Sequence, residues 1–412
     1  MKNINALFLI INKRIHKILT ILGIKFKKKN EYKDLKCIID ANNNNTLKSI
    51  QMLNSSMDEL KETLEDDFSK KFNLYNSQKE NLKKEYKNKI ILFDYKFIKV
   101  MKNWGVNLGD YIQTIAVKNV IFQLNPNIDT QYIDRDSLTT YSGSPAFAIM
   151  QGWFAHDFHF IPNNNILPIW IGTHIANHKK RFLAKFINYN PSYFANITIG
   201  CRDKNTVRIL STLGIKSYFS RCLTLTLPKR DKKNSQNKIF LVNVPDEYLE
   251  YIPNEILNNA EFINQRQIDS NLDYSDYFNT REKYENEAMN LLEKYRNEAK
   301  LIITSALHCT CPCIAMGIPV VLISPKENDP RFSVLDGILK VYSKKDLENN
   351  DIDFNPKTFD IEDLKKLMLK NVELSIKEAF DEDYNKDELL QVRQKIEKYN
   401  VLDKANLCVG VE

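Results

Sequence analysis

The sequence contains no apolar run long enough to cross a membrane. A spanning helix needs roughly 18–20 consecutive apolar residues, and no segment of the 412 residues reaches that length. Cysteine is also scarce. The seven cysteines are an odd number without regular spacing, which does not indicate a framework of disulfides. The N-terminus lacks the pattern of a cleavable signal peptide. These features favour a protein of the reducing cytosol.

Histidine is rarer still, and no metal site is visible. The six histidines and seven cysteines include Cys309, Cys311 and Cys313 at alternate positions, but no second cluster completes a four-ligand zinc site. We therefore expect these three cysteines in the core. We expect neither a metal nor another cofactor.

A basic surface for nucleic acid is absent as well. Residues 1–30 hold eight lysines or arginines and no acid, so the other residues sum to −1 out of a total charge of +7. The basic character therefore belongs to the N-terminus, and the sequence predicts no nucleic-acid partner.

Residues 1–30 have the pattern of a helix that lies on a membrane surface. Lys13, Arg14 and Lys17 fall outside its apolar face. A basic polar face suits anionic lipid headgroups. The apolar face consists of Ile11, Ile15, Ile18, Leu19 and Leu22. Peripheral membrane contact is one interpretation, and a helix packed on the protein itself or on a partner is the other.

Residues 46–88 predict a helical or coiled-coil segment. Spacings of three and four residues alternate along it, which is the a/d pattern of a coiled coil. The apolar positions are Ile50, Leu53, Met57, Leu60 and Leu64. Asp67 interrupts this register. A coiled coil that forms a homo-oligomer and an intramolecular helical hairpin both fit the pattern.

From residue 89 onward, short β-branched runs alternate with amphipathic segments, which predicts an α/β fold. A first Rossmann-like domain is expected over 89–228, a polar linker over 229–238 and a second Rossmann-like domain over 239–412, with helices at its C-terminal end. Strands are expected at 90–93, 131–133, 146–151, 167–172, 197–199, 216–219, 239–244 and 261–264.

The clearest unit is the stretch 300–324. Residues 301–303 predict a buried strand, Thr304 and Ser305 are N-cap types, and a helix is expected to end near Gly317 before a strand at 319–323. This predicts a right-handed βαβ unit. Ligands bind at the carboxyl ends of parallel strands, beside helix N-termini, and His308 falls there. A hydrogen-bonded structural histidine is the alternative interpretation.

Three shorter motifs also follow predicted strands. Asp110 closes N-L-G-D at 107–110, and it is either a site residue or the cap of the helix that follows. Arg202 comes directly after the strand at 197–199, and a pair with Asp203 or a surface acid is its alternative role. The motif G-W-F at 152–154 is expected in a loop that lines a cleft.

The order of these motifs resembles the polysaccharide pyruvyl transferase family over roughly residues 90–330. The motifs are N-L-G-D-Y-I-Q from 107, G-W-F from 152, G-C-R-D-K-N-T from 200, T-S-A-L-H from 304 and A-M-G-I-P-V-V from 315. The resemblance implies two Rossmann-like domains facing a cleft, as in GT-B glycosyltransferases.

The resemblance also implies a reaction and a location. Members move the pyruvyl group of phosphoenolpyruvate onto two hydroxyls of a sugar as a ketal, and phosphate is released. The acceptor is expected to be a bacterial surface polysaccharide, such as capsule or exopolysaccharide, or its lipid-linked precursor. We therefore expect a cytoplasmic enzyme at the inner face of the cytoplasmic membrane.

Roles for individual residues follow from the resemblance. His308 matches the family histidine and is the expected general acid for the donor's methylene carbon. Asp110 is the expected base near the acceptor hydroxyls, and Arg202 is the expected cation for the donor's charges. The further donor-binding candidates are Ser305, Asn107 and Gly109.

One position departs from the family pattern. Ala306 stands where the family commonly carries an arginine, and an alanine cannot hold the donor's phosphate or carboxylate. Arg202 and a residue not yet placed would then hold the donor, or the donor would differ. A sugar-nucleotide glycosyltransferase of the same fold and a non-catalytic scaffold for polysaccharide assembly are the alternative functions.

Overall fold

The chain divides into two compact units, Met1–Phe72 and Asn73–Glu412. The computed structural model describes residues 43–72, 86–95, 105–155, 158–231, 237–267, 277–358 and 360–402. The segment 1–30, for which we predict membrane contact, lies outside the described residues. None of the described helices is long and apolar enough to cross a bilayer.

The described part of the first unit is dominated by one long helix, α3 (Asn43–Lys71), which confirms the helical prediction for this stretch. Asp67 lies inside the helix and pairs with Lys71 at 2.8 Å, one turn further on. Such pairs stabilise a helix modestly, and lysines in the last turn suit its dipole. The coiled coil and the oligomer stay predictions.

The N-terminal part of the second unit is built from parallel strands. Its first sheet has the order β3-β1-β4-β6, and its second has the order β5-β7-β8-β9. The strands are β1 (Lys89–Asp94), β3 (Asp129–Asp134), β4 (Ala146–Ile149), β5 (Gly152–Phe154), β6 (Ile166–Ile169), β7 (Thr173–Ile175), β8 (Ile199–Cys201) and β9 (Ser217–Phe219). The apolar runs in β1 and β4 are buried almost throughout, as in parallel sheets covered on both faces.

Single backbone hydrogen bonds connect the two sheets across short gaps between their strands. The amide of Met150 donates to the carbonyl of Ile169 at 2.9 Å, and the amide of Gly200 donates to Trp170 at 2.8 Å. The strand expected at 167–172 therefore ends at Ile169, and β7 starts only at Thr173, after Gly172 with a φ of +72°. The prediction of a loop at 152–154 was wrong, because these residues form strand β5 in register with β7.

The C-terminal part contains a third parallel sheet with the order β11-β10-β13-β14-β15, the order of flavodoxin-like folds. Its strands are β10 (Lys238–Val242), β11 (Ala260–Ile263), β13 (Ala299–Thr304), β14 (Val320–Ile323) and β15 (Val341–Tyr342). Short helices α8 (Asn254–Leu257) and α11 (Lys344–Glu348) and the 3-10 helix η6 (Asp246–Tyr251) accompany it. The α/β prediction is confirmed for both parts.

The predicted βαβ unit is present as β13, α10 (Leu307–Ala315) and β14. Gly317, at a φ of +74°, follows the end of α10 as a left-handed residue. The expected N-cap was wrong, since Ala306 occupies that position without a side-chain bond. The hydroxyls of Thr304 and Ser305 instead donate to the carbonyls of Val242 and Ile323. Cys309, Cys311 and Cys313 are fully buried, as predicted.

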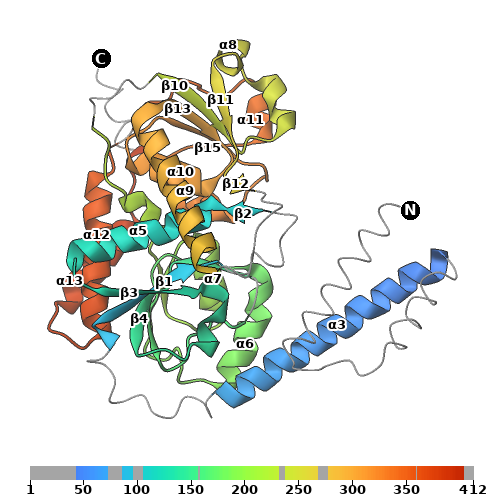
Figure 1. The fold of residues 1–412 in the computed structure, drawn as a ribbon, viewed down its shortest axis with the longest axis vertical. Coiled ribbons are helices and arrows are strands. Elements are labelled where there is room, and N and C mark those ends of the chain that lie inside the picture. The colour runs from blue at the N-terminus through green and yellow to red at the C-terminus, as the bar shows by residue number, and fades with distance from the viewer. Residues whose placement is uncertain are drawn as a thin grey trace. The chain divides into compact units, whose positions relative to one another are not determined.

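Helix α5 (Leu108–Leu124) lies between the two parts of this unit (Figure 1). It packs against β1 and the 3-10 helix η5 (Leu223–Thr226) on one side, and against α9 (Tyr277–Glu298) and α10 on the other. Most of its residues are buried, which explains why its sequence is apolar around nearly the whole circumference.

Two polar connections join the parts beside α5. Strand β2 (Val106–Asn107) pairs antiparallel with β12 (Arg266–Gln267), so each part contributes one strand to a small sheet. Further along α5, Lys118 and Tyr132 both bond to the buried carboxylate of Glu285 on α9, at 3.2 and 2.9 Å.

The C-terminal helices return to the N-terminal strands (Figure 1). Helix α12 (Glu362–Ala379) packs against β6 and η5, and α13 (Lys386–Glu397) packs against β9. The remaining described elements are η3 (Arg135–Thr140), η4 (Asn177–Lys179), α6 (Lys180–Tyr189), α7 (Lys204–Thr212) and η7 (Pro330–Leu335).

Arg221 connects η7 and α13 to the end of β9. Its side chain is buried and lies over the Phe219 ring, 4.8 Å from the centroid. Its guanidinium donates to the carbonyls that end η7 and α13, which are those of Val334, Asp336, Ile396 and Tyr399, at 2.7, 2.9, 3.2 and 3.1 Å. Burial lowers the pKa of Arg221 to about 10.

Candidate functional site

The N-termini of α5 and α10 meet at one place, and His308 lies between them. A Cβ atom added to Gly109 would lie 2.9 Å from the Cβ of His308 and 3.3 Å from its Nδ1. Because carbon atoms do not approach so closely, only glycine at 109 leaves room for His308. The sequence could not show this contact, which joins residues almost 200 positions apart.

Arg202 is the central charged residue of the site. It follows β8, and its Nη1 donates to Oε1 of Gln113 at 3.0 Å. The same Nη1 lies 3.4 Å from Nε2 of His308, a long hydrogen bond. A guanidinium can only donate, so Nε2 of His308 accepts and the neutral imidazole carries its proton on Nδ1. Arg202 and His308, both predicted as site residues, are therefore in contact.

The charge of Arg202 is not neutralised by an ion pair. The side chain is only 2% exposed, yet it forms no salt bridge with a carboxylate among the residues that the structure describes, and its Nε has no hydrogen-bond partner. Burying a guanidinium without a counter-charge is costly. The alternative role, a pair with Asp203, does not apply, because that carboxylate bonds to another residue.

The electrostatic surroundings keep His308 neutral. Burial lowers its pKa well below the ordinary 6.5, and the positive charges of Arg202 and Arg331 lower it further. The N-terminal position on α10 acts in the same direction. A protonated His308 therefore requires a negative charge, and the described side chains that act on it supply only positive ones.

Asp203 belongs to a second polar pair, with His174 on β7. Its Oδ2 lies 2.6 Å from Nδ1 of His174, and its Oδ1 accepts from the amide of Thr206 at the start of α7. Burial lowers the pKa of His174 despite this partner. Burial alone would raise the pKa of Asp203, but the bond to His174 and the charge of Arg202 hold it below its usual range. The pair is thus a carboxylate and a neutral imidazole.

Arg331 reaches the same region from η7, after β14. Its Nε and Nη2 donate to the carboxylate of Asp329, with the shortest bond at 2.6 Å. η7 packs against both α7 and α10, and the amide of Lys204 donates to Ser333 at 2.9 Å. The charge of Arg331 lowers the pKa of both His308 and His174, after burial. Nη1 has no hydrogen-bond partner in the described part of the chain.

The other predicted site residues, Asn107, Asp110 and Ser305, form hydrogen bonds of their own near Arg202 and His308. Asn107 caps α5 by accepting from the amide of Gly109 at 3.2 Å. Asp110 accepts from Nε2 of Gln113 at 3.1 Å, so Gln113 connects it to Arg202. Ser305 is turned toward β14, where its hydroxyl donates to Ile323 at 2.7 Å.

Sequence reasoning missed Gln113, His174 and Arg331. A signal existed for His174, which follows a predicted strand with a polar side chain at its carboxyl end. None existed for Arg331, because only the fold of η7 brings it near α10. Gln113 looked like an interior position of a helix, and its role depends on α5 being buried on every side.

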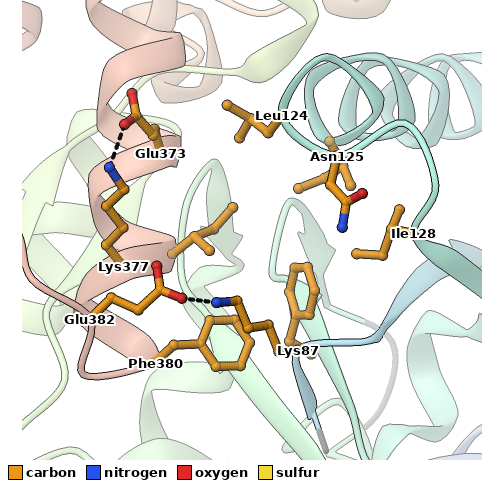
Figure 2. A pocket seen from close by; sticks show the side chains of 11 residues that line it. Lys87, Leu124, Asn125, Ile128, Glu373, Lys377, Phe380 and Glu382 are labelled. Atoms are coloured by element: carbon orange, nitrogen blue, oxygen red, sulfur yellow. Dashed lines mark hydrogen bonds and ion pairs between the residues drawn. The ribbon is translucent and has the colours of Figure 1, made fainter. Parts of the chain in front are cut away.

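A cavity of about 400 Å³ lies elsewhere, at the C-terminal end of α5 (Figure 2). Ile121, Leu124 and Phe380 line it, and ion pairs Lys87–Glu382 and Lys377–Glu373 border it. A 17-residue helix is about 25 Å long, so this cavity is remote from His308. Among the described residues, no cluster of three or more His, Cys, Asp or Glu side chains could hold a metal ion.

The comparison with known proteins gives the family. No curated protein and no solved structure matches the sequence. A family model described as polysaccharide pyruvyl transferase matches residues 107–327, which is more than half of the chain and includes Gly109, Arg202 and His308. The motifs that bring these residues together are thus those of the matched segment, and the chain belongs to the polysaccharide pyruvyl transferase family.

Proposed function

We propose that this protein transfers the pyruvyl group of phosphoenolpyruvate to a sugar of a bacterial surface polysaccharide or its lipid-linked precursor. The observation that carries the proposal is the buried guanidinium of Arg202, which contacts His308 and has no carboxylate partner among the residues that the structure describes. A bound anion would provide the missing counter-charge. Phosphoenolpyruvate carries a phosphate and a carboxylate, both of which suit a guanidinium.

The same anion would activate His308. Its carboxylate or phosphate would compete for Nη1 of Arg202 and release Nε2 of the imidazole, which now accepts from that group. The negative charge would also raise the pKa that burial and the arginines lower. His308 would then be protonated only when the donor is present, and it could deliver that proton to the methylene carbon.

Arg331 is our candidate for the residue that completes the donor site in place of the missing arginine at 306. Asp329 holds its Nε and Nη2, while Nη1 remains available. The side chain is 44% exposed, so its contribution is screened by solvent and smaller than that of Arg202. The backbone amides at the start of α10 and α5 add further attraction for an anion.

Phosphate release tests the proposed reaction. Purified protein is incubated with phosphoenolpyruvate and a panel of lipid-linked and p-nitrophenyl glycosides, and inorganic phosphate and product mass are measured. We expect phosphate only when donor and acceptor are both present, with a product that has gained a pyruvate ketal. Turnover of a nucleotide sugar instead would assign the protein to glycosyl transfer. Binding of glycans without turnover of either donor would favour a scaffold.

Residues 1–30 would bring the enzyme to lipid-linked acceptors at the membrane surface. Support comes from their eight basic residues, absence of acids and single apolar face. Flotation with phosphatidylglycerol vesicles tests this. We expect the full chain to float and a chain lacking residues 1–30 to stay behind, and equal flotation of the two would contradict it.

A further inference from the structure

The pair of His174 and Asp203 has the geometry of a catalytic base and the group that orients it. Asp203 is completely buried and His174 is 5% exposed. Their bond of 2.6 Å involves Nδ1, so the carboxylate fixes the proton there and leaves the lone pair on Nε2. An aspartate that orients a histidine in this way also stabilises the imidazolium that forms when the histidine accepts a proton.

The other nitrogen of this histidine, Nε2, has no hydrogen-bond partner among the residues that the structure describes, which give a partner only to Nδ1. The imidazole lies beside the half-buried ring of Trp153, with centroids 6.5 Å apart. Trp153 is the residue of the G-W-F motif whose function was otherwise unassigned, and an aromatic ring next to a base is a suitable neighbour for the apolar face of a sugar.

His174 also lies next to the donor site. β7 and β8 pair with Thr173 opposite Cys201, so His174 and Arg202 are the next residues on two adjacent strands, and the amide of Arg202 donates to the carbonyl of Thr173 at 2.8 Å. Arg202 in turn contacts His308. The charge of Arg202 lowers the pKa of both His174 and His308, after burial, so the two imidazoles belong to one electrostatic neighbourhood.

We propose that His174 is the general base that accepts the proton of the attacking acceptor hydroxyl, and that the sugar binds beside Trp153. This inference rests on the proposed pyruvyl transfer. It replaces Asp110 in that role, because the Oδ1 of Asp110 already accepts from Gln113 and the charge of Asp110 acts on the buried Arg135. Asp110 then serves as a positioning residue, which holds Gln113 and through it Arg202.

Protons and bonds balance with two histidines. In the first addition His308 gives a proton to the methylene carbon, a hydroxyl oxygen bonds to the central carbon, and His174 takes the hydroxyl proton. In the second addition the bond from the central carbon to the phosphate oxygen breaks, and the second hydroxyl takes that place. Of the two hydroxyl protons released, one replaces the proton given by His308 and one leaves on the phosphate.

The tautomer of His174 is the first test, and it needs no acceptor. Long-range proton–nitrogen spectra of histidine-labelled protein contain signals of only six residues, and His174→Gln assigns one of them. At pH 7.5 we expect a neutral imidazole protonated on Nδ1, both without and with phosphoenolpyruvate. A proton on Nε2, or a charged ring, leaves no lone pair for the hydroxyl and would overturn the proposal.

Kinetics of matched variants are the second test. We expect His174→Gln to lower kcat by about 10²–10⁴, with unchanged affinity for phosphoenolpyruvate. The rise of kcat/KM with pH on the acidic side should disappear, which a structural role would not cause. Asp203→Asn keeps the N-cap of α7 but loses the acceptor for Nδ1, so a comparable loss is expected. His178→Gln, whose Nε2 bonds to the carbonyl of Ala155 at 2.6 Å, is the control and should retain activity.

The two proposals fail in different ways. If wild-type protein consumes phosphoenolpyruvate and Asp110→Asn loses the acidic side of the profile while His174→Gln keeps it, pyruvyl transfer stands and the assignment of His174 is wrong. If wild-type protein releases no phosphate from phosphoenolpyruvate with any acceptor, the proposed function is wrong, whatever tautomer His174 adopts.

Discussion

Two buried arginines of the same region show how differently a guanidinium can be used. Among the described residues, neither Arg202 nor Arg221 forms an ion pair with a carboxylate, and both are at most 2% exposed. Arg221 donates from all three nitrogens to four backbone carbonyls. Within the same part of the chain, Arg202 uses only Nη1, toward Gln113 and His308, and its Nε has no partner.

We interpret the difference as that between an arginine that holds the fold together and one that is available to bind a ligand. We call Arg221 with its four carbonyls the closed cluster, and Arg202 with Gln113 and His308 the open cluster. In the closed cluster each nitrogen of Arg221 donates to a carbonyl, so the cluster stabilises the junction of η7 and α13 and has little left for a ligand. The open cluster contains an unpaired charge and an N–H group without an acceptor among the described residues. Both destabilise the free protein and favour the binding of an anion.

The largest expected effect is on turnover, through His308. His308→Gln keeps a polar side chain of similar reach but removes the titrating proton, and losing a general acid typically costs about 10²–10⁴ in rate. The measurement is phosphate release at saturating donor and acceptor. The free energy of unfolding should change by less than about 1 kcal/mol, because the amide oxygen of glutamine can still accept a hydrogen bond from Arg202. Turnover within a few-fold of wild type would make His308 structural.

The next effect tests the contrast in stability directly. Arg221→Met removes a donor from four buried or half-buried carbonyls, of which that of Ile396 still accepts from the amide of Tyr399. Each unsatisfied group costs about 1–3 kcal/mol, so we expect a loss of at least about 3 kcal/mol. Arg202→Met, the matched control, should change stability by no more than about 1 kcal/mol, because it also removes an unpaired charge. Urea unfolding followed by circular dichroism measures both. Equal losses would erase the distinction between the clusters.

For donor affinity the order of the two arginines is reversed, and Arg202 should matter more than Arg221. Arg202→Ala should weaken phosphoenolpyruvate binding by about 1.5–3 kcal/mol, the value of hydrogen bonds to a charged group, or roughly 10- to 150-fold in Kd. Isothermal titration calorimetry provides the measurement. Arg221→Met, examined below its unfolding transition, should bind the donor like wild type. Unchanged affinity of Arg202→Ala would show that the donor binds elsewhere.

A smaller effect is expected at Arg331, which is closer to solvent. Arg331→Ala should weaken donor binding by about 2- to 5-fold, since exposed charges contribute about 1 kcal/mol or less. Ala306→Arg in the same chain restores a cation at the start of α10 and should recover most of the affinity. A double variant as weak as Arg331→Ala would mean that the two positions do not serve the same ligand group.

The smallest expected effect is the uptake of a fraction of a proton by His308 when the donor binds. Burial and neighbouring arginines lower the pKa of His308 in the free protein, and a bound anion raises it. Binding should therefore take up a fraction of a proton between the two pKa values, and donor affinity should increase as the pH falls through that window. Calorimetry in buffers of different ionisation enthalpy detects this uptake. The uptake should vanish in His308→Gln, and uptake that persists there would assign it to another group.

Much of the fold was predictable because its signals are local. The runs at β1, β10, β13 and β14 are continuous and apolar, and Gly317 marks the end of α10. The division of β6 from β7 and the strand at 152–154 were not predictable, since they depend on pairing between strands. The site was predicted in part, because Arg202 and His308 each follow a strand, but their contact and the space left by Gly109 arise only in three dimensions.

The short ladder of β2 and β12 has a consequence for how the chain could be divided. Asn107, which caps α5, pairs with Arg266 of the C-terminal part. Helix α9 of that part also packs against α5. The covalent linker at 229–238 is therefore not the only connection between the two parts. Two separate polypeptides, cut within that linker and expressed together, should reassemble through this shared backbone, and recovered enzymatic activity would serve as a reporter of their complementation.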